Sequence, residues 1–179
     1  GGDLLAHLRS LKCFTEPQAM FFMAEVSLGL EYLHEQGICH RDVKPENVLL
    51  DEDGHVRLTD FGLSKMGLEG EATTLTICGT PEYLPPEVFR HEGYGCEFDW
   101  WSAGVLLFEM LEGRPPFRDP NKQRLIKLII EGKFTFRCVH SRRVTSLVCE
   151  LLCPDYASRL KSARELKAHP WFGGINWSA

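Results

Sequence analysis

The stretch HRDVKPEN, from His40 to Asn47, concentrates several chemically useful side chains in one short segment. Its polar members are the imidazole of His40, the guanidinium of Arg41, the carboxylates of Asp42 and Glu46, the ammonium of Lys44 and the carboxamide of Asn47. Pro45 forces the chain into an irregular path between them. The stretch is either a charged surface loop or a site that handles a proton and a charged group together.

A β-hairpin is predicted directly after this stretch, in NVLLDEDGHVRLTD. An apolar run leads to an acidic turn that closes at Gly54, and Val56 and Leu58 then alternate with polar residues. Such a hairpin brings Asn47, at its start, close to Asp60, at its end. A carboxamide and a carboxylate are hard-oxygen donors that suit Mg²⁺ when substrate phosphates complete its coordination.

Helices are predicted on both sides of this hairpin. Thr15, Pro17 and Gln18 predict a helix start, and the apolar face that follows ends at Gly37, so this helix delivers the chain to His40. The segment from Asp99 to Glu112 predicts a buried core helix, because its apolar run is far shorter than the roughly 20 residues of a membrane span. Further helices are expected at about 121–131, 141–153 and 162–168, whereas weak periodicity after Gly62 predicts a loop as far as Cys78.

Composition limits the class of protein. The chain has 179 residues, 44% of them hydrophobic, and a formal charge of −5, which predicts one globular unit, no nucleic-acid partner and an acidic face suited to basic peptides. Seven scattered cysteines indicate neither a disulfide framework nor a zinc ribbon, so we expect an intracellular protein, cytoplasmic or nuclear. Cys149 and Cys153 are expected to be small core residues rather than metal ligands.

The motifs and their order resemble the signature set of protein kinases. HRDVKPEN is followed by DFG at 60–62 and by PPE at 85–87. CGTPEYLPPEV, FDWWSAGVLLFEMLEGRPPF and HPWFGGINW resemble the AGC group of Ser/Thr kinases, which includes the cyclic-nucleotide-dependent and ribosomal S6 kinases. The resemblance runs from Gly1 to Trp177 and implies a protein-kinase-like fold, mainly α and α+β overall, in which 1–179 form the helical C-terminal lobe with its small hairpin. The N-terminal lobe and the AGC tail are expected outside these residues, since Gly1–Asp3 resembles the end of the interlobe hinge.

This resemblance implies catalytic roles for the opening stretch. Asp42 would accept or orient the proton of the attacking hydroxyl, Lys44 would contact the transferring phosphate, and Thr80 would hydrogen-bond to both. Asn47 and Asp60 would hold Mg²⁺. Lys44 also favours Ser or Thr over Tyr as the acceptor.

The resemblance further implies contacts to ATP and a set of structural residues. The expected nucleotide contacts are Asp3, Leu4, Glu46, Asn47, Leu49, Thr59 and Asp60, and we expect Leu4 and Leu49 to face solvent when the other lobe is missing. The expected structural residues are His40 and Phe61 of the hydrophobic spine, Gly62, the Glu87–Arg159 pair and Asp99, which would brace the HRD backbone. His40 is therefore expected to be a packed core residue rather than a general base.

Regulation and substrate choice are implied by the same family. Thr76 lies where the activation-loop phosphate is carried, with Arg41 and Lys65 as its cationic partners, although Thr73 and Thr74 are nearby competitors. An upstream kinase would then act on Thr76. Asp3, Glu46 and Glu109 lie where basophilic AGC kinases face the ribose or the arginines before the acceptor, which predicts Arg or Lys upstream of the target Ser or Thr. Ile77, Pro81 and Leu84 would line an apolar pocket for the next substrate residue.

Two hypotheses from different classes remain. The chain is either part of an ATP- and Mg²⁺-dependent Ser/Thr kinase or a truncated, non-catalytic product that binds substrates or partners. A metal-dependent hydrolase explains the oxygen ligands but not the arrangement of Arg41, Lys65 and Thr76. The glycine-rich loop, strand lysine and helix-C glutamate of an active kinase are absent from these residues, so the isolated lobe is expected to be inactive.

Overall fold

The computed structural model describes residues 1–68 and 73–177 and shows a mainly helical body with two small sheets. Its helices are α1 (Leu4–Leu11), α2 (Glu16–Glu35), α3 (Pro86–Phe89), α4 (Phe98–Glu112), α5 (Lys122–Glu131), α6 (Arg142–Leu151) and α7 (Ala163–Ala168). Its strands are β1 (Gly2–Asp3), β2 (Ile38–Cys39), β3 (Val48–Leu50), β4 (Val56–Leu58) and β5 (Lys65–Met66). The expected helical lobe with a small hairpin is confirmed.

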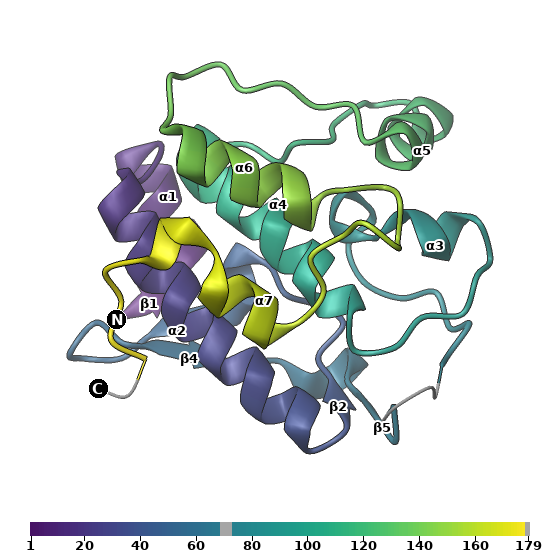
Figure 1. Cartoon of the computed structure of the whole chain (residues 1–179), viewed down its shortest axis with the longest axis horizontal. Coiled ribbons are helices and arrows are strands. Elements are labelled where there is room, and N and C mark those ends of the chain that lie inside the picture. Colours follow the sequence, from purple (N-terminus) through teal and green to yellow (C-terminus); the bar gives the residue numbers. More distant parts are fainter. Residues whose placement is uncertain (69–72, 178–179) are drawn as a thin grey trace.

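Two helices form the centre of this body. In Figure 1, α2 and α4 lie side by side, α6 packs on α4, and α7 packs on α2. Every residue of α4 except Glu109 and Glu112 is buried, so the prediction of a core helix holds. No helix within residues 1–68 and 73–177 combines the length and apolarity that a membrane crossing requires.

The helix ends follow from local chemistry. Gln18 Oε1 accepts hydrogen bonds from the backbone N–H and the hydroxyl of Thr15 at 3.0 and 2.9 Å, which fixes the start of α2 as the sequence predicts. Helix α6 ends at Leu151, two residues before the predicted end at 153. Pro154 accounts for the difference, since a proline disfavours helical backbone at the residue before it.

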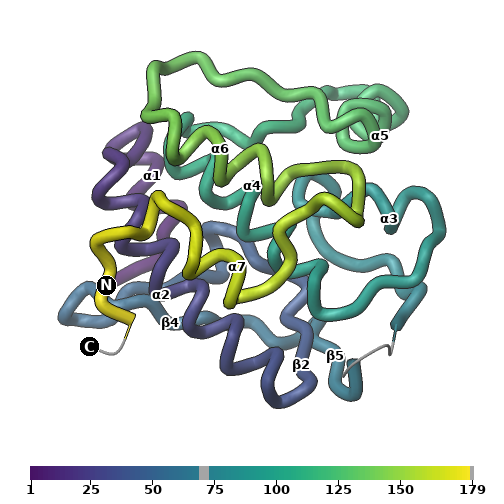
Figure 2. Tube along the Cα trace, viewed as in Figure 1, coloured from purple at the N-terminus to yellow at the C-terminus, as the bar shows by residue number. Residues whose placement is uncertain are grey.

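Strands β2, β4 and β5 lie in the lower half of Figure 2, below α4 and α6. β3 and β4 form the predicted antiparallel hairpin, with Val48 opposite Leu58, and β1 adds a third strand at the edge of β3. β2 pairs with β5, which lies inside the segment predicted to be a loop. That prediction is therefore wrong for Lys65–Met66, while its residues 69–72 lie outside the described chain.

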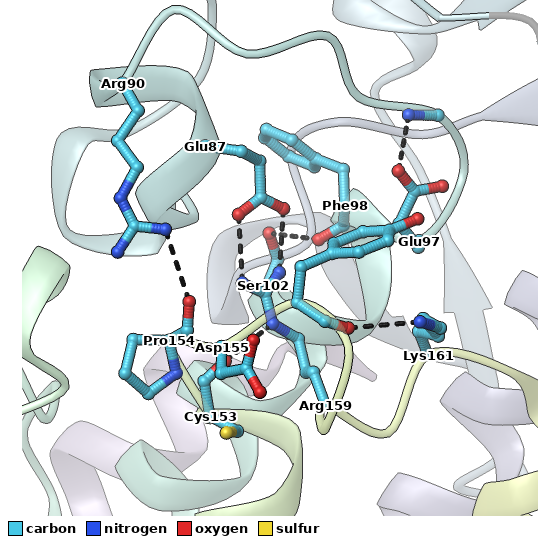
Figure 3. A network of polar contacts seen from close by, with 12 residues as sticks. Glu87, Arg90, Glu97, Phe98, Ser102, Cys153, Pro154, Asp155, Arg159 and Lys161 are labelled. Carbon is cyan, nitrogen blue, oxygen red and sulfur yellow. Dashed lines mark hydrogen bonds and ion pairs between the residues drawn. The ribbon is translucent and has the colours of Figure 1, made fainter.

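A buried ion pair joins the segment before α4 to the segment after α6. Figure 3 shows Glu87, on α3, facing the guanidinium of Arg159, with oxygen–nitrogen distances of 2.7 and 2.9 Å. Arg159 also donates to the Cys153 carbonyl at 2.8 Å, and its guanidinium stacks over the Trp101 ring at 4.8 Å. Both charges are buried, so the pair is tolerated because nearly every donor is matched by an acceptor.

Candidate active site

The backbone at the start of the HRDVKPEN loop is held by one buried carboxylate. Asp99, in the first turn of α4, accepts hydrogen bonds from the backbone N–H groups of His40 and Arg41, each at 2.8 Å. Its Oδ2 also contacts His34 Nε2 at 2.8 Å, from the end of α2. Arg41 has a φ of +65°, a conformation that costs a non-glycine residue about 1–2 kcal/mol. The two Asp99 bonds hold the residue that makes this strained turn and the residue before it.

Asp42 is the centre of a four-residue polar cluster. Its Oδ2 accepts hydrogen bonds from Lys44 Nζ at 2.7 Å and from Asn47 Nδ2 at 2.9 Å. Lys44 Nζ also reaches the Thr80 hydroxyl at 3.3 Å, and Asn47 Nδ2 also donates to the Asp42 carbonyl at 2.8 Å. The structure thus brings together the four residues expected to be catalytic, although Thr80 is hydrogen-bonded to Lys44 and, within residues 1–68 and 73–177, not to Asp42 as expected. Asp42 Oδ1 receives no hydrogen bond from the described residues, so it remains available to accept a proton.

The segment before Thr80 can lie close to Arg41 and Asp42 because residue 79 is a glycine. Gly79 has a φ of +97°, and a Cβ there would lie 3.0 Å from the Arg41 carbonyl oxygen and 3.9 Å from Asp42 Oδ1. A larger residue would both strain the backbone and enter the space beside Asp42.

Asn47 and Asp60 fit a magnesium ion, as judged from their free oxygens. Both N–H bonds of the Asn47 carboxamide are directed at Asp42, so its Oδ1 is free to be a ligand. The hairpin register sets Thr59 against Asn47 through a 3.0 Å backbone hydrogen bond. Asp60 follows as an exposed residue, and its carboxylate accepts a hydrogen bond from Gly62 N–H at 3.3 Å. In the described residues no group of three or more His, Cys, Asp or Glu suits a metal, so a magnesium ion there would need oxygens from a substrate.

His40 is a packed residue with both ring nitrogens engaged. It is fully buried, its Nδ1 accepts from the Asp42 N–H at 3.3 Å, and its Nε2 lies 3.0 Å from the Thr59 carbonyl. That pattern requires the neutral tautomer with the proton on Nε2, which leaves no lone pair for catalysis. The Phe61 ring packs on His40 at 5.1 Å and is 49% exposed on its other side.

The predicted nucleotide contacts divide into surface and core residues. Leu49 is 38% exposed, and Asp3 accepts from Ala6 N–H at 2.6 Å, which caps α1. The Thr59 hydroxyl is directed at the Asn47 carbonyl at 3.2 Å, and Glu46 is exposed. The expectation that Leu4 faces solvent is wrong: this side chain is completely buried in the main core, because it is the first residue of an amphipathic helix.

A small polar network surrounds Thr76. Lys65 Nζ donates to the Thr74 hydroxyl at 2.7 Å, which in turn lies 3.2 Å from the Thr76 hydroxyl. The Tyr94 hydroxyl donates to the Thr76 carbonyl, and burial raises the pKa of Tyr94 to about 12. Arg41 donates through Nε to the Leu63 carbonyl at 2.7 Å, but its buried NH1 has no partner among the described residues. Thr76 is exposed, and the Thr74 hydroxyl links it to the ammonium group of Lys65.

Glu109 belongs to an acidic cluster. Its carboxylate accepts a hydrogen bond from the buried Tyr83 hydroxyl. Burial raises the pKa of Glu109, and the charges of Glu46 and Glu82 raise it further, whereas Arg118 opposes them. Repulsion of this kind makes the cluster a favourable place for a cation.

The predicted apolar substrate pocket is brought together only in part. Ile77 is 56% exposed and Pro81 is exposed, whereas Leu84 is 3% exposed and packs in a core cluster with Val88 and Tyr94. Leu84 therefore supports this surface from below rather than forming it.

His34, Tyr83 and Tyr94 contact residues of the candidate site and are not predicted from the sequence. For His34 the sequence holds a weak indication, because it is a polar residue in the last turn of an otherwise apolar helix. For the two tyrosines the sequence holds no such indication, because their hydrogen bonds to Glu109 and Thr76 join segments that are far apart in the chain.

A pH-dependent contribution to stability is expected from the His34–Asp99 pair. Burial alone lowers the pKa of His34, but the hydrogen bond to Asp99 and its charge outweigh burial, so the pKa of His34 rises. Burial alone raises the pKa of Asp99, but His34 and the two backbone N–H groups outweigh it and lower this pKa. The His34 contribution is fully present below its unfolded value of 6.5 and is lost as pH rises through its higher folded value.

We therefore expect His34→Gln to lower the melting temperature of the full-length protein most below pH 6.5, with a deficit that shrinks as pH rises. Melting curves across a pH series provide the measurement. The control is His55→Gln, because His55 pairs with Glu25 on the surface, where solvent screens the interaction. A His34→Gln deficit that stays constant with pH would contradict this assignment.

Comparison with known proteins agrees with this geometry. Residues 1–172 match the family model of the protein kinase domain. Protein kinase 2 of Dictyostelium discoideum is 46% identical over 179 residues, covering 99% of this chain and 37% of that protein. Ribosomal protein S6 kinase 2 beta of Xenopus laevis is 44% identical over 182 residues, covering 99% of this chain and 29% of that protein.

The human cAMP-dependent protein kinase catalytic subunit PRKX is 43% identical over 183 residues, covering 100% of this chain and 50% of that protein. The chain thus spans half or less of the length of these three relatives. From the family match and the AGC kinases among its relatives, we conclude that the chain belongs to the protein kinase domain family and, within it, to the AGC group.

Proposed function

We propose that the complete protein is an ATP-dependent Ser/Thr kinase and that residues 1–179 are the C-terminal lobe of its catalytic domain. The observation that carries this proposal is the cluster of Asp42, Lys44, Asn47 and Thr80. Asp42 Oδ1 would accept or orient the proton of the substrate hydroxyl, and Lys44, held between Asp42 and Thr80, would contact the transferring phosphate. A hydrogen-bonded arrangement of this kind fixes the reacting groups before the substrate arrives.

The cofactors are proposed to be ATP and Mg²⁺. Asn47 Oδ1 and the Asp60 carboxylate would hold magnesium, which would neutralise charge that develops on the transferred phosphate. Leu49 and Thr59 would face the adenine, and Asp3 and Glu46 the ribose. Leu4 would support this surface from the core.

Phosphate transfer by the full-length protein tests this function. We expect Asp42→Asn to lower kcat by about 10²- to 10⁴-fold, because the amide cannot accept the proton. The assay measures transfer from ATP to an arginine-rich Ser peptide. Asp53→Asn is the matched control, since Asp53 is exposed in the hairpin turn, and it should leave kcat unchanged. No transfer by a folded, Thr76-phosphorylated protein would favour a non-catalytic binding role instead.

The proposed substrates carry Arg or Lys upstream of the target Ser or Thr. Support comes from Glu109, whose carboxylate is partly buried beside Glu46 and Glu82. A guanidinium would relieve the repulsion among these groups by pairing with the Glu109 carboxylate, which also accepts a hydrogen bond from Tyr83. Ile77 and Pro81 would contact the residue after the acceptor.

The basic-substrate proposal predicts a selective effect of Glu109→Gln. We expect kcat/KM for an arginine peptide to fall about 10- to 150-fold, because a hydrogen bond to a charged group contributes about 1.5–3 kcal/mol. A peptide with alanine in place of arginine should be nearly unaffected and is the control. Equal losses for both peptides would indicate damage to the site rather than lost recognition of arginine.

We propose that an upstream kinase phosphorylates Thr76 and that the phosphate orders the surrounding segment. Lys65 and the unpartnered NH1 of Arg41 would neutralise it, and Arg41 directly precedes Asp42. Phosphorylation would therefore couple this segment to the catalytic loop. We also propose an intracellular location, cytoplasmic or nuclear, on the basis of the scattered cysteines and of ATP as the phosphate donor.

For Thr76, the expected result is that Thr76→Ala lowers kcat of the full-length protein at least about tenfold, because Arg41 and Lys65 then lack their anion. Thr73→Ala is the matched control and should retain activity. The measurement is the transfer rate before and after treatment with the activating kinase. Unchanged activity of Thr76→Ala would rule out this role.

A further inference from the structure

Two segments of this acidic chain contain cations and no acidic residue. One runs from residue 4 to residue 15 and carries Arg9 and Lys12. The other runs from residue 132 to residue 149, and its cations are Lys133, Arg137, Arg142 and Arg143. The whole chain has a formal charge of −5, so these two segments are opposite in sign to the rest of the molecule. The functions proposed above use none of these cations.

The fold brings these two segments together at the end of α4. Phe14 N–H donates to the Met110 carbonyl at 2.7 Å, so the chain that leaves α1 runs beside this helix end. Glu112, the last residue of α4, accepts hydrogen bonds from the N–H groups of Arg137 and Cys138 at 2.8 and 3.1 Å. Figure 1 shows α1 and the start of α6 on the same side of the molecule, at the upper left.

The cations gathered there form a basic patch that the protein itself does not neutralise. Its members are exposed and form no ion pair within residues 1–68 and 73–177: Arg9, Lys12, Arg137, Arg142 and Arg143. The nearby carboxylates are engaged elsewhere. Glu112 is bound to the loop before α6, and Glu16 accepts from the N–H and the hydroxyl of Ser141 at 2.6 and 2.7 Å. Glu109, one turn earlier in α4, accepts from the Tyr83 hydroxyl.

The outer face of α6 continues from this patch without negative charge. Arg142, Arg143, Ser146 and Cys149 are exposed on this helix, whereas its apolar residues face the core. Cys149 is exposed rather than in the core, so the expectation from the sequence is wrong for this residue. The first acidic residue of the helix is Glu150, near its end. The face before it therefore does not repel an anionic surface.

A fully exposed aliphatic side chain lies within the same loop. Val139 is 101% exposed, yet the residues on both sides of it are fixed by one buried carboxylate. Cys138 N–H donates to Glu112 at 3.1 Å, and His140 Nε2 lies 2.8 Å from the same carboxylate. Val139 is therefore held away from the protein rather than free to fold back onto it. Leu11, at the end of α1, is also 53% exposed.

We propose that the basic patch and Val139 bind the surface of an anionic phospholipid membrane. The cations would be attracted to the negative headgroups, to which the patch is complementary in charge. Val139 and Leu11 would enter the boundary between headgroups and acyl chains, where an aliphatic side chain is covered while its basic neighbours stay in water. The lobe would lie on the membrane rather than cross it. A soluble acidic protein would need the cations but not Val139.

Sedimentation of the full-length protein with lipid vesicles tests the proposal. Vesicles of phosphatidylcholine with about one-third phosphatidylserine are compared with vesicles of phosphatidylcholine alone. We expect binding to the charged vesicles only, and binding that weakens as salt is added, because salt screens the attraction. The double variant Arg142→Gln/Arg143→Gln should lower the partition constant about 30-fold, since each cation near the surface contributes about fivefold. Val139→Ser should lower it at least about fourfold, the factor for one methylene removed from water.

The matched control is Arg57→Gln/Lys127→Gln, which removes the same charge from two exposed cations that pair with Asp51 and Glu131. This variant should bind the charged vesicles like the unmodified protein. All the substituted side chains are exposed, so the variants should fold, and their melting temperatures verify this.

The proposal is overturned when the protein binds both kinds of vesicle equally or binds neither. It is also overturned when the control variant loses as much binding as Arg142→Gln/Arg143→Gln. Binding to soluble polyglutamate without binding to the charged vesicles would indicate an acidic protein partner and would overturn it as well.

Discussion

The carboxylate of Asp99 is the constraint on which the rest of the structure depends. It is completely buried, and burial of a charge is tolerated only when hydrogen bonds replace the lost water. Three donors from two other elements provide these bonds: His34 at the end of α2 and the N–H groups of His40 and Arg41. The catalytic loop cannot move away from α4 without leaving this charge unsatisfied, so the position of Asp42 is tied to the core.

Around this fixed point the lobe carries two surfaces of opposite charge. On one side, Lys65 donates to the Thr74 hydroxyl, which lies 3.2 Å from the Thr76 hydroxyl, so an anion is favourable there. On the other side, Glu46, Glu82 and Glu109 repel one another, and a cation is favourable. The two surfaces therefore differ in the sign of the charge that they favour.

The long helices and the hairpin could be predicted because their signals are local. The cap at Thr15, the apolar run after Asp99 and the turn at Gly54 each lie within a few residues of the structure that they determine. The two-residue strands β1, β2 and β5 could not, since they are too short to show any periodicity and exist only through their partners. The burial of Leu4 could not be predicted either, because the residues that cover it come from distant parts of the chain.

The residues of the candidate site could likewise be predicted only where they lie close together in the sequence. Asp42, Lys44 and Asn47 lie in one short motif, and the hairpin register brings Asp60 to them. The contacts of His34 and Tyr94 each join segments that are distant in sequence, and no pattern in either segment alone specifies them. Such residues are detected only once the chain is folded.

The left-handed backbone of Arg41 limits the transfer of the HRDVKPEN motif to other proteins. A free peptide with the sequence HRDVKPEN would avoid a φ of +65° at an arginine, because nothing in those residues compensates for the cost. The compensation comes from an aspartate 58 residues further along the chain. The motif therefore cannot be transferred alone. On another scaffold without a matching buried carboxylate, the same side chains would point in different directions. The geometry of the loop is in this sense a property of the helical core, because α4 carries the carboxylate that fixes it.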